Sequence, residues 1–301
     1  MLTEHRRWVY YTAAIVTAGI FAILCATKES RPSKRLETKI EQLRKVNITD
    51  LQAAESPDSM KDTRELLRVI FWRPIQLGCT EPIIILVSLM NATAWGLVYL
   101  FTESLTVVYG QYGWSSTTSS LTFIAIAIGV PFSILPRFWD LHVLHSKKQQ
   151  NKKIEPEDKI IGFAIAAPCL AIGLWLFSWT IPPYVHTHWV VSLLGLVLIG
   201  FAANEFAYTL NAYLSDSYTV YASSSLAALA FLRGTVSGVM PLFAHQMFTG
   251  LGSNVAGSII AGVATLFCVM PFVFFRYGKS MREKSRFARQ SVEMNEKFGD
   301  H

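Results

Sequence analysis

The sequence predicts an all-α membrane protein, a bundle of seven transmembrane helices, from its composition, the placement of its charges and the length of its apolar segments. Hydrophobic residues make up 51% of the 301 residues and charged residues only 16%, against about 25% in ordinary globular proteins. The mean hydropathy is +0.34. The charges crowd into 28–73, 137–159 and 276–301, and long, almost uncharged stretches lie between them. One soluble core could not bury so much apolar sequence.

Seven apolar segments reach the length of about 20 residues that a bilayer-spanning helix needs. They run over 8–27, 82–108, 117–136, 160–181, 189–210, 221–244 and 254–275. None has the alternating pattern of a strand, and backbone groups in lipid must be satisfied internally, so we expect helices. The predicted organisation is a first span (1–27), a cytoplasmic central loop (28–80), a six-span bundle (81–276) and a cytoplasmic tail (277–301).

The lysines and arginines predict the orientation of these segments. Eleven lie in 28–73, six in 137–159 and seven in the tail from Arg276 onward, while the connections 109–116, 182–188 and 245–253 carry none. Basic loops stay on the cytoplasmic side of a membrane. We therefore expect the N-terminus outside and the C-terminus in the cytoplasm.

The central loop contains one short amphipathic pattern. Leu36, Ile40 and Leu43 recur at helical spacing among charged residues, and Ser33 can cap the helix. Such a helix is expected to lie along the cytoplasmic surface. Residues 46–63 are polar and are expected to be a connector between two groups of helices.

Composition and motifs argue against several functions. The net charge of +6 comes from loops that flank apolar spans, so it does not indicate a nucleic-acid partner. The four cysteines show no metal-ligand spacing, and the histidines lack the supporting ligands of a metal site. No nucleotide, hydrolase or metalloprotease motif occurs. We expect no cofactor, no metal and no enzymatic activity.

Three ionisable residues fall at membrane depth, where each costs roughly 2.5–3.5 kcal/mol on insertion scales and is a functional candidate for that reason. They are Glu103, Glu205 and Arg233. An ion pair between Glu205 and Arg233 is conceivable but needs a long reach. Ala230, Gly234 and Gly238 form a run of small residues beside Arg233, which predicts close approach of a neighbouring helix there.

A polar and aromatic stripe runs along the second span. Asn91, Trp95, Tyr99 and Glu103 follow at intervals of four residues, a spacing that drifts only slowly around a helix. Stacking, hydrogen bonding and the carboxylate would suit a cavity for an amphipathic or cationic solute. The alternative is that Trp95 and Tyr99 pack against neighbouring helices while Glu103 is solvated at the interface.

Several stretches resemble the major facilitator superfamily of transporters, and within it the fungal drug:proton antiporters. In chain order they are 28–34 (KESRPSK), 80–82 (TEP), 99–103 (YLFTE), 155–159 (EPEDK), 173–180 (GLWLFSWT), 213–218 (YLSDSY), 221–228 (YASSSLAA), 232–234 (LRG) and 275–278 (FRYG). The ordered series covers nearly the whole chain, which makes it more specific than any single motif in it.

The resemblance implies efflux of small amphipathic compounds, such as drugs, toxins or secondary metabolites, across the plasma membrane. Such transporters have two six-span halves that rock around a site between them. The chain resembles the sixth span, the central loop and the C-terminal half. It would then need an N-terminal half or a second copy as partner. Arg137 and Asp140 resemble the remains of the family's gating loop, which has lost its glycines here.

Two other interpretations remain open at this stage. A seven-helix receptor fits the number of spans and the external N-terminus, although its first inner loop would be unusually long and no receptor signature is present. A non-functional transporter fragment fits the same sequence.

Overall fold

The computed structural model describes residues 2–26, 68–150, 155–183 and 187–291. The chain divides into two units, Met1–Leu66 and Leu67–His301. In the first unit α1 (Leu2–Ala26) is described, and its apolar stretch, Tyr10–Cys25, is shorter than that of the other candidate spans. Its assignment as a seventh span therefore stays a prediction. The predicted amphipathic helix around Leu36 lies outside the described residues.

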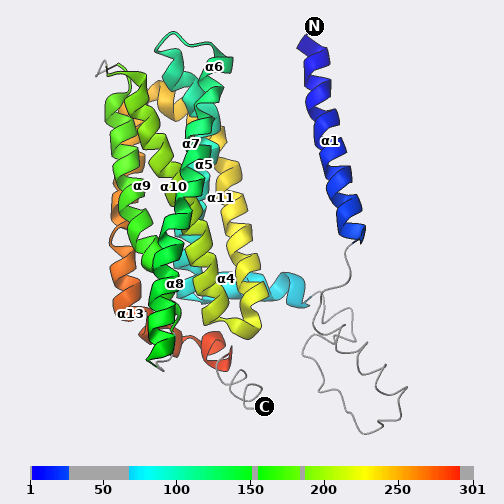
Figure 1. Cartoon of the computed structure of the whole chain (residues 1–301), viewed down its shortest axis with the longest axis vertical. Helices are drawn as coiled ribbons and strands as arrows, with labels where there is room; N and C mark the ends of the chain where they lie inside the picture. The colour runs from blue at the N-terminus through cyan, green and yellow to red at the C-terminus, as the bar shows by residue number, and fades with distance from the viewer. Residues whose placement is uncertain (1, 27–67, 151–154, 184–186, 292–301) are drawn as a thin grey trace. The chain divides into compact units, whose positions relative to one another are not determined.

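Six apolar helices of the second unit are long enough to cross a membrane, which confirms a helical membrane bundle. They form a bundle of long helices (Figure 1). The described residues contain no strand. The six spans are Pro82–Gly110, Ser116–Gln149, Ile161–Thr180, Trp189–Ser217, Thr219–Gly250 and Ser253–Lys284.

Three of these spans are single helices: α5 (Pro82–Gly110), α9 (Ile161–Thr180) and α10 (Trp189–Ser217). The other three are built from consecutive segments, in part because prolines interrupt regular helical hydrogen bonding. The segments are α6 (Ser116–Leu121), α7 (Phe123–Gly129), the 3-10 turn η2 (Val130–Ser133), which contains Pro131, and α8 (Ile134–Gln149); η4 (Thr219–Tyr221) and α11 (Ala222–Gly250); and α12 (Ser253–Phe267) and α13 (Met270–Lys284).

Two boundaries differ from the sequence prediction for a physical reason. The third span was expected to end at residue 136 and the last at 275, where polar residues begin. The helices instead continue to Gln149 and Lys284. Lysines and arginines are good helix formers, so a helix does not stop where its apolar stretch does. Arg137 and Asp140 consequently lie on helix α8 and not in a loop.

A short element precedes the bundle inside the segment that was predicted to be a loop. The π-helix η1 (Arg68–Trp72) leads into α4 (Arg73–Thr80), which lies across the direction of the long helices (Figure 1). Glu81 then ends α4 and begins α5, with Pro82 in the first turn of α5. Proline is well suited to this position because its missing N–H would have no partner there.

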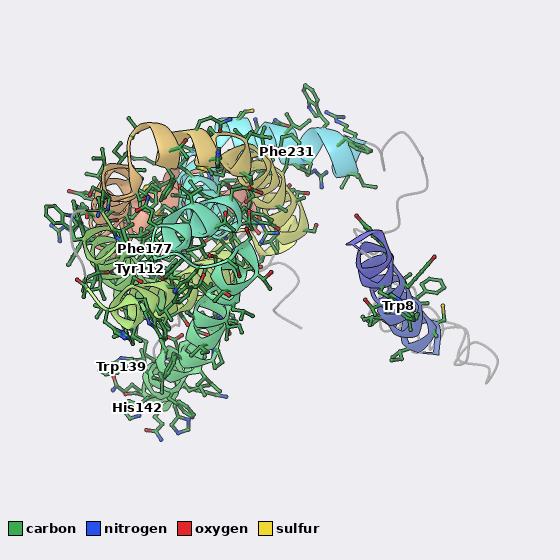
Figure 2. All side chains as sticks on the ribbon, turned by 90° about the horizontal axis from the view of Figure 1, so that it is seen from above. Trp8, Tyr112, Trp139, His142, Phe177 and Phe231 are labelled. Carbon is green, nitrogen blue, oxygen red and sulfur yellow. The ribbon has the colours of Figure 1, made fainter. Side chains whose placement is uncertain are left out.

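Apolar side chains both fill the bundle and cover its outside. The most apolar windows of α5, α9 and α10 are 56–61% buried, while those of Ser116–Gln149, Thr219–Gly250 and Ser253–Lys284 are 17–28% buried. Phe177 lies within the bundle, whereas Trp139 and Phe231 project from it (Figure 2). An exterior of this kind suits contact with lipid or with further helices.

Glycines on both sides allow helices α7 and α10 to approach closely. A Cβ on Gly200 of α10 would overlap the carbonyl oxygen of Ile126 in α7, and one on Gly129 would overlap that of Val197 in α10. At Gly234 and Gly238, by contrast, an added Cβ would have no described atom within 4 Å apart from the nearby chain of its own helix. The predicted close approach at that small-residue run is therefore wrong for the described part of the chain.

Candidate functional site

Two groups of polar residues lie inside the helical bundle, and a third joins helix ends at one end of it. The first group centres on Glu205 in α10, whose side chain is fully buried. It is paired with the guanidinium group of Arg137 in α8. Thr209 also donates to Glu205 Oε2 at 3.3 Å. Arg137 in turn contacts Asp140 Oδ2 at 2.8 Å and lies over the ring of Tyr208, 4.1 Å from its centroid.

The partner of Glu205 is the main correction to the sequence analysis. We considered a pair between Glu205 and Arg233, and the structure forms none. Arg137 takes that place because α8 continues as a helix beyond the predicted end of its span and carries this arginine against α10. Buried charges are stable only when paired, and the Arg137–Glu205 pair satisfies this requirement.

Gly162 of α9 also lies against this ion pair, whose two members come from α8 and α10. A Cβ at this position would collide with the carboxylate of Glu205, and it would lie 2.5 Å from Arg137 Nη2 and 3.0 Å from Thr209 Oγ1. Helix α9 therefore lies directly against the ion pair. Sequence reasoning missed Gly162 and Thr209. The one available signal for Thr209 was its spacing of four residues from Glu205, which places both on one helix face.

The second group joins α5 to α11 and, through Asn211, to α10. The guanidinium carbon of Arg233 is 5.1 Å from the centroid of the Trp95 ring. One turn earlier on α5, the buried Asn91 donates from Nδ2 to Asn211 Oδ1 at 3.3 Å. Two buried polar atoms here, Asn91 Oδ1 and Trp95 Nε1, have no hydrogen-bond partner among the described residues. We call the contact of Trp95 on α5 with Arg233 on α11 the seam. It combines a cation, an aromatic face and hydrogen-bonding groups that have no partner among the described residues.

The four residues of the predicted stripe do not share one environment. Asn91 is buried and Trp95 half-buried, while Tyr99 and Glu103 are exposed on the bundle surface. The structure therefore brings Asn91, Trp95 and Arg233 to one region. Tyr99 and Glu103 take no part in the contacts of these three residues. Asn211, which holds Asn91 in place, was not among the predicted site residues.

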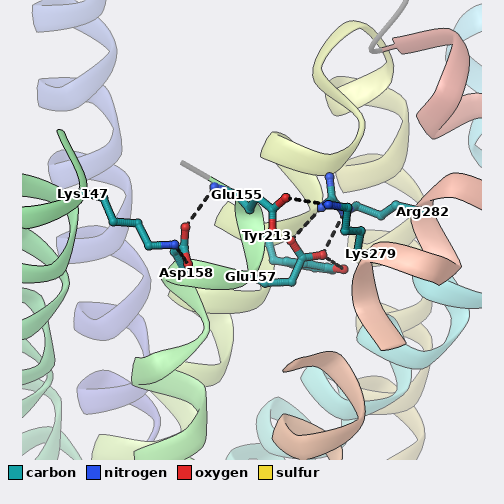
Figure 3. A network of polar contacts seen from close by, with 7 residues as sticks. All are labelled: Lys147, Glu155, Glu157, Asp158, Tyr213, Lys279 and Arg282. Atoms are coloured by element: carbon teal, nitrogen blue, oxygen red, sulfur yellow. Dashed lines mark hydrogen bonds and ion pairs between the residues drawn. The ribbon is translucent and has the colours of Figure 1, made fainter. Parts of the chain in front are cut away.

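A third, surface group ties the ends of several helices together (Figure 3). Glu157, in the 3-10 turn η3 (Pro156–Lys159), accepts two hydrogen bonds from Arg282 of α13, at 2.8 and 2.7 Å. Tyr213 of α10 lies 3.5 Å from the same carboxylate. Around this pair lie Lys279–Glu155 at 3.2 Å, Lys147–Asp158 at 2.6 Å and Lys159–Asp216 at 2.5 Å.

Two of the family-like stretches meet at a further contact. Tyr218, between α10 and α11, donates its hydroxyl to Glu81 Oε2 at 3.1 Å, and both side chains are buried. Burial, followed by the nearby Glu81 carboxylate, raises the pKa of the Tyr218 phenol. The phenol therefore stays protonated and available as a donor at any physiological pH.

These observations define the class of protein: a polytopic helical membrane protein with buried charges between its spans. No family model and no solved structure matches the chain. Curated proteins do. The chain is 32% identical to the major facilitator-type transporter sorT of Penicillium rubens over 97% of its own length. It is 32% identical to the efflux pump FUB11 of Gibberella moniliformis over 97%, and 29% identical to the major facilitator superfamily multidrug transporter FLU1 of Candida albicans over 94%.

The chain is therefore a relative of the major facilitator superfamily transporters along nearly all of its length. It spans 56%, 50% and 47% of sorT, FUB11 and FLU1, respectively, which is about half the length of these relatives. The family resemblance seen in the sequence is confirmed, and the receptor interpretation is not favoured.

Proposed function

We propose that this chain forms the C-terminal half of an efflux transporter for small amphipathic compounds. The observation that carries the proposal is the sequence relationship, which runs through all six spans to proteins named as transporters and efflux pumps. The transport site of this superfamily lies between two bundles that rock against each other. We therefore propose that a second six-helix bundle, in the same or another polypeptide, completes the site.

Each group of polar residues has a role in this proposal. Asn91, Trp95 and Arg233 contribute to the substrate site, with Tyr99 and Glu103 facing the second bundle. Glu205, buried and paired, is placed to couple transport to a change of protonation or of partner. Arg137 and Asp140 form the gate, because Arg137 contacts both carboxylates and holds α8 to α10. Polar groups at membrane depth are costly, and this supports functional roles for them.

Transport by a completed pair of bundles is the direct test. A yeast strain lacking its own drug exporters would express this chain, the N-terminal half of sorT, or a fusion of the two. We expect resistance to some members of a panel of toxic amphipathic compounds from the fusion only. We also expect the separate chain to be oligomeric in mild detergent or to be degraded. A stable monomer that moves substrate would remove the need for a second bundle, and a well-expressed fusion without any resistance would contradict efflux.

The proposed location is the plasma membrane. The proposed orientation places the N-terminus outside the cell and the C-terminus in the cytoplasm. Five basic residues in 28–39 follow the first predicted span, and two, Arg6 and Arg7, precede it. We expect an epitope tag at residue 1 to be accessible on intact cells and a tag at residue 301 only after permeabilisation. Both tags on one side would show that the chain crosses the membrane an even number of times.

A further inference from the structure

We propose that the seam between α5 and α11 binds the carboxylate of an aromatic organic acid, with Arg233 and the indole N–H of Trp95 as donors. The inference rests on the proposed function and narrows it, because it names aromatic organic anions as the substrate class. The proposed ligand is an anion. The sequence had favoured an amphipathic or cationic solute because of the carboxylate of Glu103.

The charge at this seam is not balanced by the protein itself. Arg233 lies about midway along the span Thr219–Gly250, where a charged side chain is most costly. No carboxylate pairs with it among the described residues. Helix α11 contains no acidic residue, and the single acidic residue of α5 is Glu103, which is exposed two turns beyond Trp95. On α10, Glu205 is already paired with Arg137 and Asp216 with Lys159.

Among the described residues, the contact between Arg233 and Trp95 leaves the N–H donors of both side chains without an acceptor. A guanidinium group that stacks on an aromatic ring keeps its N–H edge available, and that edge matches the two oxygens of a carboxylate. The indole N–H of Trp95 is buried and lacks an acceptor among the described residues. The Ser237 hydroxyl, one turn after Arg233 on the same helix, is also buried and without a partner there. Unsatisfied buried donors are rare and suggest a missing acceptor.

The rest of the seam suits the ring of such a ligand. The indole of Trp95 provides a flat face for stacking. The side chain of Met240 on α11 lies against Gly96 of α5, 3.1 Å from where a Cβ would be, and a flexible methionine can move to accommodate an apolar ring. The Asn91–Asn211 bond joins α5 to α10 one turn before Trp95 and adds a polar group next to the seam. A flat, apolar ligand with one carboxylate fits these features. The positive charge of Arg233 would repel a ligand with an ammonium group.

Paired ligands that differ only in charge test the proposal by direct binding. The probes are 2-naphthoate and its neutral amide, 2-naphthamide, measured by equilibrium dialysis at pH 7 against the purified chain and against the fusion described above. We expect the unsubstituted protein to bind naphthoate at least tenfold more tightly than naphthamide. Arg233→Gln should remove this preference and leave naphthamide binding unchanged. Trp95→Leu should weaken both ligands. Arg276→Gln serves as the control, because Arg276 is an exposed arginine on α13 with no ion pair among the described residues.

Three results would overturn the proposal: no binding of naphthoate to either protein, equal binding of the two probes, or a preference for naphthoate that survives Arg233→Gln. Each can be told apart from failure of the proposed efflux function. Binding does not require transport, so a fusion that exports neutral or cationic compounds but shows no naphthoate preference would refute the anion site alone. A fusion that binds naphthoate through Arg233 but transports nothing would refute efflux alone.

Discussion

Replacing Arg137 by methionine is expected to lower the free energy of unfolding by about 3–5 kcal/mol, because it leaves the buried Glu205 carboxylate without its counter-charge. Methionine keeps much of the length of the side chain but none of its charge, so the loss reports on the ion pair more than on packing. Thr209 alone would remain bonded to Glu205, at 3.3 Å. The readout is the midpoint of thermal unfolding in mild detergent, with an expected decrease on the order of 10 °C.

A second variant and a control make this result specific. The double variant combines Arg137→Met with Glu205→Gln, which removes the buried carboxylate. We therefore expect the double variant to be more stable than the Arg137→Met variant. Arg276→Met removes an exposed arginine and should leave the midpoint unchanged. An Arg137→Met protein that unfolds at the wild-type temperature would show that the pair does not hold α8 to α10.

Gly200→Ala is expected to separate α7 from α10. The added methyl group would overlap the carbonyl oxygen of Ile126 and lie 2.8 Å from its carbonyl carbon and 2.9 Å from its Cα. Backbone atoms cannot rotate out of the way as a side chain does, so the helices themselves must move. Overpacking of this kind costs about 1–3 kcal/mol, and occasionally more. Thermal unfolding in detergent and the yield of monodisperse protein would show the loss.

Gly234→Ala is the matched control for this substitution. It is also a glycine inside a long helix, and apart from the nearby chain of that helix no described atom lies within 4 Å of the added methyl group. Because alanine favours helix over glycine by about 1 kcal/mol, stability should be unchanged or slightly higher. Equal destabilisation by both substitutions would show that the α7–α10 contact is not the cause, because helix propensity favours alanine at both positions.

The spans of the bundle could be predicted because each depends on local composition. An apolar segment of about 20 residues has few alternatives to a helix in lipid. The ends of the spans were less predictable, since helix α8 continues through Lys147 and Lys148 for reasons that hydropathy does not report. Asp158 holds Lys147 there at 2.6 Å, which is a tertiary contact.

The side-chain partners inside the bundle could not be predicted either, because they too depend on tertiary contacts. Depth along a helix marked Glu205 and Arg233 as candidates, and spacing along the second span marked Trp95. Neither states which helices are neighbours or how they are rotated, and this decides that Arg137 meets Glu205 while Arg233 meets Trp95. Small residues likewise permit close packing without requiring it, as the surroundings of Gly234 show.

The ion pairs at the helix ends differ in their exposure to water, and this gives them different mechanical roles. Glu157 and Arg282 are 10% and 16% exposed, whereas Lys279 and Glu155 are 64% and 40% exposed. Dissolved salt screens exposed pairs far more than sheltered ones. At high ionic strength the outer contacts loosen first while Glu157 stays fastened to Arg282. That bidentate contact then acts as a pivot between α13 and the turn η3, which stay joined after the outer pairs have loosened.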